Sequence, residues 1–305
     1  MSTSDSHIIL RAQEFLHTHA RLLERRLAGA WFSGDDPAAA VAVLDALAAY
    51  RNADGGLGHA LEPDVRAPLS QPLAVDFALE TVEQVLESPA GGHARVRDAA
   101  RAFAASVEPY LAAVAAPTGG LPIVFPSIAR CPRADHWGDG RFPPGINPTA
   151  GIVARLRLLE VSTPWLDAAE AFCRKEIDAL FDRDEFDAHA ALNVLRFLES
   201  LGEDPWAAER TAQLAGRIGE LSFFHLYPGA GYGLTPLDFA PEPENPRRAL
   251  FPADAVEAHL DALAEGQAAD GGWTVPWQPP GPAAELEWRG VVTVRAARVL
   301  TANGR

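Results

Sequence analysis

Two short segments of the same design, one near each end of the chain, limit what this sequence can fold into. Residues 51–58 read Arg-Asn-Ala-Asp-Gly-Gly-Leu-Gly, and residues 267–273 read Gln-Ala-Ala-Asp-Gly-Gly-Trp. Each follows a stretch with helical periodicity, and its glycines can adopt the left-handed conformation that ends a helix. Weaker copies stand at 118–121 and 229–234. The repetition predicts paired helices joined by Gly-rich turns, an all-α repeat architecture.

Apolar residues recur with helical spacing through most of the chain. Four of the expected helices begin at a capping side chain followed by proline, which has no N–H group to leave unpaired in the first turn. These four pairs are Asp36-Pro37, Asn147-Pro148, Thr163-Pro164 and Asp204-Pro205. The predicted helices span residues 8–32, 38–50, 72–87, 94–115, 148–160, 164–181, 188–201, 205–221, 253–267 and 285–301.

The composition favours a single acidic domain over residues 1–305. Hydrophobic residues make up 48% of the chain, which is enough for one large core, and no long polar linker divides it. The formal net charge of -15 excludes nucleic acid as the main partner, because phosphate binding needs clustered Lys and Arg. No apolar run approaches the roughly 20 residues that a membrane span needs.

The N-terminal residues and the cysteines indicate a cytoplasmic protein. Residues 1–7 are polar and do not resemble a signal peptide. The two cysteines, Cys131 and Cys173, lack metal-ligand spacing and fit a reducing compartment. Motifs for nucleotide cofactors are absent, so we predict no cofactor and leave Mg²⁺, Zn²⁺ and the oligomeric state open.

The segment Gln267-x-x-Asp270-Gly271-Gly272-Trp273, with the helix that precedes it, resembles the QW repeat of terpenoid cyclases. The segment from Arg51 to Gly58 is similar, with Arg in place of Gln and Leu in place of Trp. The same helix–Gly-Gly–helix repeat occurs in protein prenyltransferase β subunits. The resemblance implies an α/α toroid of roughly ten to twelve helices, with inner helices around a central apolar cavity and outer helices covering them.

The resemblance carries over no catalytic residue. Class II terpenoid cyclases use a DxDD acid motif, which this sequence lacks. Protein prenyltransferases hold zinc with Asp, Cys and His from separate repeats, whereas Cys131, Asp135 and His136 lie together in one loop.

Two irregular segments carry the residue types of an acid–base site. Residues 59–68 hold a histidine, two carboxylates and an arginine, and either carboxylate can act as a general acid if burial raises its pKa. The competing interpretation is an Arg66 salt bridge that pins the turn. In residues 133–139, a histidine lies beside an aspartate and a tryptophan. The catalytic candidates are Asp64, Glu62, Asp135 and His136.

The substrate-binding candidates are aromatic and polar residues of the loops and of two helix faces. Tryptophans near the last helix can wall an apolar site or stabilise a cation, although core packing is the simpler interpretation for Trp273. His189, Asn193 and Arg196 share one helix face, as do Asp76, Glu80, Glu83 and Glu87, and we expect the acidic face to be solvated. The candidates are His59, Arg66, Trp137, His189, Asn193, Tyr232, Trp273, Trp277, Glu287, Trp288 and Arg289.

The leading hypothesis is a terpenoid-cyclase-like enzyme that uses a carboxylic acid to start cyclisation of an isoprenoid or similar apolar substrate. The alternatives are a carbohydrate-active α/α-barrel enzyme with paired carboxylates and a sugar-like substrate, and a non-catalytic toroid that binds a ligand. A deep apolar cavity with one buried acid favours the first, an open polar cleft with two carboxylates about 5–9 Å apart the second, and a filled centre without a pocket the third.

Overall fold

The computed structural model describes residues 3–183 and 185–305; Met1 and Ser2 of the polar N-terminal stretch, and Asp184, lie outside the described residues. Within this part of the chain the secondary structure is helical, and extended pairing is limited to isolated bridges such as Val65–Arg133. The all-α prediction is therefore confirmed.

The α-helices are α1 (Thr3–His19), α2 (Leu22–Phe32), α3 (Pro37–Ala48), α4 (Pro72–Glu87), α5 (Ala94–Val114), α6 (Ile146–Leu158), α7 (Pro164–Phe181), α8 (Ala188–Ser200), α9 (Pro205–Arg217), α10 (Pro236–Phe239), α11 (Ala253–Glu265) and α12 (Pro282–Ala302). Short 3₁₀ turns are η1 (Pro126–Arg130), η2 (Asp135–Trp137), η3 (Ile218–Glu220) and η4 (Pro246–Leu250).

Two differences from the predicted helices matter. The single helix expected over residues 8–32 is two helices, because Arg21 has an extended backbone between α1 and α2. Its guanidinium donates to the carbonyls of Ala60 and Leu61, so the break places Arg21 against the α3–α4 loop. The four-residue helix α10 was not predicted, since it is too short to show periodicity.

Three of the four predicted caps are confirmed. The side chains of Asp36, Thr163 and Asp204 each accept a backbone N–H of the helix that follows. At the fourth pair, the chain is kinked at Asn147, which has non-helical angles and a cis bond to Pro148, and the Asn147 side chain accepts no backbone N–H among the described residues.

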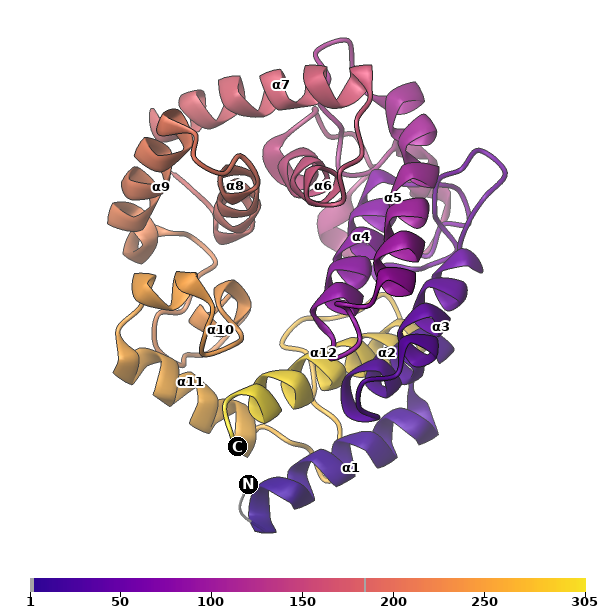
Figure 1. Ribbon diagram of the computed structural model, residues 1–305, viewed down its shortest axis with the longest axis vertical. Helices are drawn as coiled ribbons and strands as arrows, with labels where there is room; N and C mark the ends of the chain where they lie inside the picture. Colours follow the sequence, from indigo (N-terminus) through magenta and orange to yellow (C-terminus); the bar gives the residue numbers. More distant parts are fainter. Residues whose placement is uncertain (1–2, 184) are drawn as a thin grey trace.

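The helices form a two-layered ring (Figure 1). The inner helices α2, α4, α6, α8 and α12 and the short α10 surround the centre, and α1, α3, α5, α7, α9 and α11 cover them from outside. The ring closes where α1 packs against α12, so the two ends of the chain meet. The main hydrophobic core lies between the layers and includes Phe15, Leu79 and Phe197, each buried. The predicted α/α toroid with inner and outer layers is confirmed.

The Gly-rich turns are built alike at three places. Residues 52–56, 116–120 and 268–272 each form the same two backbone hydrogen bonds. The amide of the first residue donates to the carbonyl of the fifth, and the amide of the fourth residue donates to the carbonyl of the first. The fourth residues, Gly55, Gly119 and Gly271, all have φ between 86° and 93°. The copy at 118–121 is therefore genuine, whereas 229–234 belongs to a longer loop in which His225 and Leu234 pair through their backbones.

The side chains of the two Asp-Gly-Gly turns are also equivalent. Arg51 donates to Gly55 and to Ser106 of the outer helix α5, and Gln267 donates to Gly271 and to Ile8 of the outer helix α1. In each turn the aspartate accepts the amide of the second glycine. The arginine at 51 thus replaces glutamine without changing the turn, because both side chains donate to the same two kinds of carbonyl.

Candidate functional site

The α3–α4 loop and the loop before η2 pair with each other at one end of the ring. The amide of Ala134 donates to the Asp64 carbonyl at 2.9 Å, and the amide of Arg66 donates to the Pro132 carbonyl at 3.0 Å. Beneath them, Val65, Ala67, Val124, Ile128, Ala134 and Trp137 form a buried apolar cluster. The two segments that carry the predicted acid–base residues are thereby held side by side.

Asp64 is the centre of the candidate site. Its residue is only 4% exposed, and Oδ1 has no hydrogen-bond partner among the described residues. Burial raises the pKa of this carboxyl above its ordinary value of 3.8, while the indole of Trp288, the charge of His136 and the indole of Trp277 oppose the rise. A buried, incompletely bonded carboxyl with a raised pKa has the properties of a proton donor.

The indole N–H groups of Trp277 and Trp288 lie close enough to influence Asp64 but are not in hydrogen-bonding geometry with it. Both Nε1 atoms are buried and have no partner in the part of the chain that the structure describes. Two donors and one acceptor are thus left unpaired together among the described residues, which is energetically unfavourable for buried groups.

Glu62 is buried next to Asp64. It is 7% exposed, and its Oε2 likewise lacks a partner within residues 3–183 and 185–305. Burial raises its pKa well above 4.5, and the nearby charge of Asp64 adds to the rise. Two carboxyls that resist ionisation therefore lie on the same loop, with one residue, Pro63, between them.

The Arg66 salt bridge predicted for this loop exists, but its partner is Glu287 of α12. The Arg66 guanidinium binds the Glu287 carboxylate through both of its terminal nitrogens, and Arg21 lies 3.8 Å from the same carboxylate. The bridge holds the loop to the last helix and leaves Glu62 and Asp64 free of it.

A line of rings, the aromatic arc, runs beside Asp64. It comprises Phe77, Trp288, Trp277, Tyr232 and His189, whose successive ring centroids lie 6.2, 5.2, 5.3 and 5.7 Å apart. At its end the Tyr232 hydroxyl and His189 Nε2 form a 2.7 Å hydrogen bond. Burial lowers the pKa of His189, so it is neutral at neutral pH. Phe77 was not a candidate from the sequence, since a single phenylalanine on an inner helix looks like core.

Other predicted residues lie at the edge of this arrangement. His136 and Asp135 are exposed, and the His136 ring packs on buried Trp137 at 4.5 Å. His59 is exposed, and its ring forms a 2.9 Å hydrogen bond with the side chain of Asn52 in the Gly-rich turn. Asn193 is buried on α8 and packs against Gly151 of α6.

Trp273 and Arg289 lie in the joint that closes the ring. Trp273 is buried with Ile9, Ala12 and Leu300, and its indole donates to the Leu263 carbonyl. Arg289 binds Asp270 at 2.7 Å and stacks over Phe15. The structure thus places both away from Asp64 and in the packing between α1, α11 and α12.

The acidic face of α4, which the sequence analysis expected to be solvated, belongs to a helix of the inner layer. Arg155 of α6 binds Asp76 at 2.7 Å and Glu83 at 2.9 Å, and two arginines of α12 bind Glu80 and Glu87. These contacts come from both neighbouring inner helices, so the stripe faces the ring interior. The side chains of Asp76, Glu80 and Glu83 are still 17%, 25% and 27% exposed, which shows that water reaches this interior.

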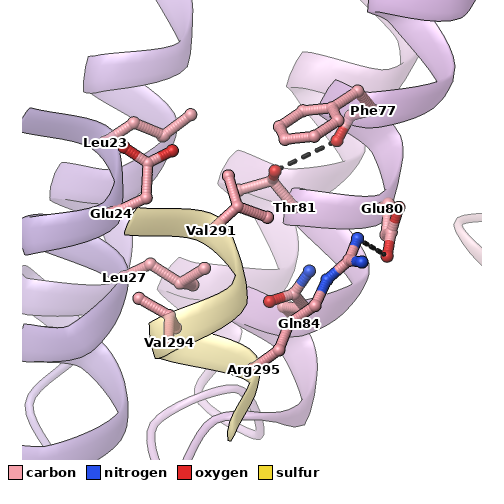
Figure 2. A pocket seen from close by; sticks show the side chains of 10 residues that line it. All are labelled: Leu23, Glu24, Leu27, Phe77, Glu80, Thr81, Gln84, Val291, Val294 and Arg295. Carbon is pink, nitrogen blue, oxygen red and sulfur yellow. Dashed lines mark hydrogen bonds and ion pairs between the residues drawn. The ribbon is translucent and has the colours of Figure 1, made fainter. Parts of the chain in front are cut away.

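A small cavity of about 20 Å³ lies between α2, α4 and α12 (Figure 2). Phe77, Glu80, Gln84 and Arg295 are among its lining residues, and Arg295 reaches across to Glu80. A volume of this size holds about one water molecule. The cavity therefore suits a water beside the buried Gln84 side chain and is too small for a substrate.

The described chain contains no group of three or more His, Cys, Asp or Glu side chains placed to hold a metal ion. Among the same residues, no helix combines the length and the apolar character needed to cross a membrane.

The comparisons with known proteins establish the fold alone. No family model matches the sequence, and no curated protein does so either. A crystal structure of a protein from Actinoplanes superimposes with a TM-score of 0.52 at 17% sequence identity, covering 99% of this chain and 100% of that one. The chain is therefore similar to that solved protein in its helical architecture over its whole length.

Proposed function

We propose that this protein is a terpenoid-cyclase-like enzyme that protonates an alkene in an isoprenoid or similar apolar substrate. The observation that carries the proposal is Asp64, a buried carboxyl with a raised pKa and an unpartnered Oδ1 within the described residues, set beside two tryptophans. The resemblance of the Asp-Gly-Gly turns to QW repeats supports the same class.

In the proposed reaction, Asp64 gives its proton to one alkene carbon. The π electron pair forms the new C–H bond, and the other carbon becomes a cation that a second alkene of the substrate attacks to close a ring. The product cation then loses a proton to water, and the Asp64 carboxylate takes up a proton from solvent, so that the product is neutral and the acid is restored. Trp288 and Trp277 present π systems to such a cation, and this attraction is stronger where water is excluded.

Glu62 has a positioning role in this scheme. Burial and the nearby charge of Asp64 raise its pKa well above 4.5, so it resists ionisation beside the proposed donor. An ionised neighbour would raise the pKa of Asp64 further and weaken it as a donor.

A carbohydrate-active enzyme would need two available carboxylates on either side of a sugar. The carboxylates of α4 are bound to arginines, which makes them poor acids or bases for that reaction.

The two cysteines are free thiols, and with the acidic composition they support a cytoplasmic location for the proposed enzyme.

The test is incubation of the purified chain with a panel of linear isoprenoids in D₂O, followed by mass spectrometry of the products. We expect a cyclic product that carries one deuterium from solvent. The Asp64→Asn variant should lose turnover with an unchanged or higher melting temperature, because the substitution removes a buried acid that lacks a full set of partners. The matched control is Asp139→Asn, an exposed aspartate whose loss should leave turnover intact. Turnover by Asp64→Asn at the wild-type rate would rule out the assigned acid.

A further inference from the structure

Arg196 occupies the inner face of α8, two helical turns from His189. The charged groups that act on it belong to Glu80 and Glu83 of α4, Arg155 of α6 and Arg247 of η4. Because α4 and α6 belong to the same inner layer as α8 (Figure 1), charged groups that act on Arg196 from these helices place its guanidinium toward the ring interior. Among the described residues it makes no hydrogen bond and no ion pair within 4 Å.

The nearby carboxylates already have guanidinium partners. Arg155 binds Asp76 and Glu83, and Arg295 binds Glu80. Arg298 binds Glu87 and Glu242, and Arg247 binds Glu199. Among the described residues, the guanidinium of Arg196 therefore has no carboxylate within ion-pair distance in this part of the ring interior.

Arg155 contributes a second unused donor. It is 2% exposed, and its Nη2 has no partner in the described parts of the chain, although Nε and Nη1 bind Glu83 and Asp76. Burial and the neighbouring charge of Arg155 lower the pKa of Arg196, while Glu83 and Glu80, which already bind other arginines, oppose that change. A protein keeps such an unfavourable arrangement where a ligand relieves it.

We propose that Arg196, together with Nη2 of Arg155, binds the carboxylate of an amphipathic carboxylic acid. A guanidinium matches the two oxygens of a carboxylate in a planar, bidentate geometry. Glu80 and Glu83 lie near the same guanidinium, so a single negative charge is tolerated there better than the several charges of a diphosphate.

The position of Arg196 connects this site to the aromatic arc, and this part of the inference rests on the proposed function. His189 and Arg196 are seven residues apart on one face of α8, a rise of about 10 Å along the helix. A ligand whose carboxylate lies at Arg196 can therefore extend its apolar chain toward Trp277 and Asp64. The proposed substrate is then an isoprenoid-like acid whose polar end is fixed and whose alkene meets the acid.

Isothermal titration calorimetry on the full chain tests the site, with decanoate, decanol and inorganic pyrophosphate as probes. We expect decanoate to bind the wild type more tightly than the other two. Arg196→Gln should weaken decanoate binding by at least about tenfold, because a charged partner is lost. The control Arg141→Gln, which alters an exposed arginine, should bind as the wild type does.

Two further measurements separate this inference from the proposed function. Asp64→Asn should bind decanoate unchanged, so a failure of catalysis leaves the binding result intact. Arg196→Gln should melt at or above the wild-type temperature, since it removes an uncompensated charge; a variant that unfolds is replaced by Arg196→Lys, which should retain weaker binding. Wild-type affinity for decanoate in Arg196→Gln, no decanoate binding to the wild type, or tighter binding of pyrophosphate would each overturn the proposal.

Discussion

The guanidinium of Arg66 binds the carboxylate of Glu287, a residue 221 positions later in the chain. This bond ties the α3–α4 loop to the last helix and crosses the seam where the ring closes. It also determines the state of the neighbouring acids, because an Arg66 bound to Asp64 or Glu62 would favour the ionised form of either carboxyl. With Arg66 engaged elsewhere, both keep a raised pKa.

The Arg66–Glu287 bond should be measurable as a coupling energy. The two side chains are 25% and 20% exposed, so solvent screens the pair in part, and we expect a coupling of about 1–2 kcal/mol in a double-mutant cycle of Arg66→Gln and Glu287→Gln. Urea unfolding of the four proteins gives the value. The matched cycle of Arg66→Gln with Asp64→Asn should couple by less than about 0.5 kcal/mol. A larger coupling to Asp64 would contradict the assigned partner.

Glu83 and Glu87, one turn apart on α4, should affect the pH dependence of stability with opposite signs. Burial raises the pKa of Glu87 to about 7, against the opposing charge of Arg298, so its folded form keeps a proton that the unfolded chain releases near 4.5. Its contribution to stability is present below pH 4.5 and is lost as the pH rises to about 7. The melting temperature of Glu87→Gln, relative to wild type, should therefore increase between pH 4.5 and 7 and then level off.

For Glu83 the opposite holds. The charges of Arg155 and Arg196 outweigh burial and lower its pKa to about 2. Its contribution to stability is present above pH 4.5 and is lost as the pH falls toward 2. Glu83→Gln should be less stable than wild type at neutral pH, and the difference should shrink below pH 4.5. Parallel melting curves for the two variants across pH 3–8 would show that these assignments are wrong.

The Gly-rich turns should not tolerate a side chain. Gly271 has φ of 93°, and a Cβ atom there would lie 2.4 Å from the Arg11 carbonyl oxygen. We expect Gly271→Ala to lower the free energy of unfolding by about 2–4 kcal/mol, from the left-handed conformation and the clash with α1. Gly216, inside α9 with open space around it, is the control, and Gly216→Ala should stabilise by about 0.5–1 kcal/mol. Equal effects would mean that the turn geometry is not required.

The Trp288 indole should lower the pKa of Asp64. Because its N–H group opposes the rise in the pKa of Asp64, Trp288→Phe should raise that pKa further while keeping a ring in the aromatic arc. A ¹³C NMR titration of labelled aspartate carboxyls measures the shift. Trp165→Phe is the control, since the Trp165 indole donates to the Gly119 carbonyl at 3.1 Å and not to the site. An unchanged Asp64 pKa in Trp288→Phe would show that the indole N–H does not affect the acid.

Local sequence was a reliable guide wherever a short-range interaction fixes the backbone. Pro72–Glu87 and Pro164–Phe181 match the predicted helices residue for residue, because proline at the first position, joined in the second by the Thr163 cap, acts within one turn. The division at Arg21 was missed since its cause lies in the carbonyls of Ala60 and Leu61, about forty positions away.

The candidate site was predictable in part. Asp64, Trp277 and Trp288 were proposed because their residue types suit an acid and an aromatic wall, and the structure brings these three together. Trp273 is a tryptophan of the same C-terminal segment, yet it lies in the closing joint. Spacing alone does not distinguish them, because the side of the turn that a tryptophan faces is set by packing against α1.

The sequence by itself determined the helical repeat and its turns, since helix periodicity, proline caps and left-handed glycines act over a few residues and depend little on the rest of the chain. Only the tertiary structure decided which helix faces are inside the ring. The acids of α4 and Arg196 of α8 have the pattern of solvated surfaces, and closure of the ring turned them inward. A charged helix face has the same sequence pattern whether it covers the outside of the ring or lines its hydrated interior. Which of the two it does depends on packing against helices that are distant in sequence.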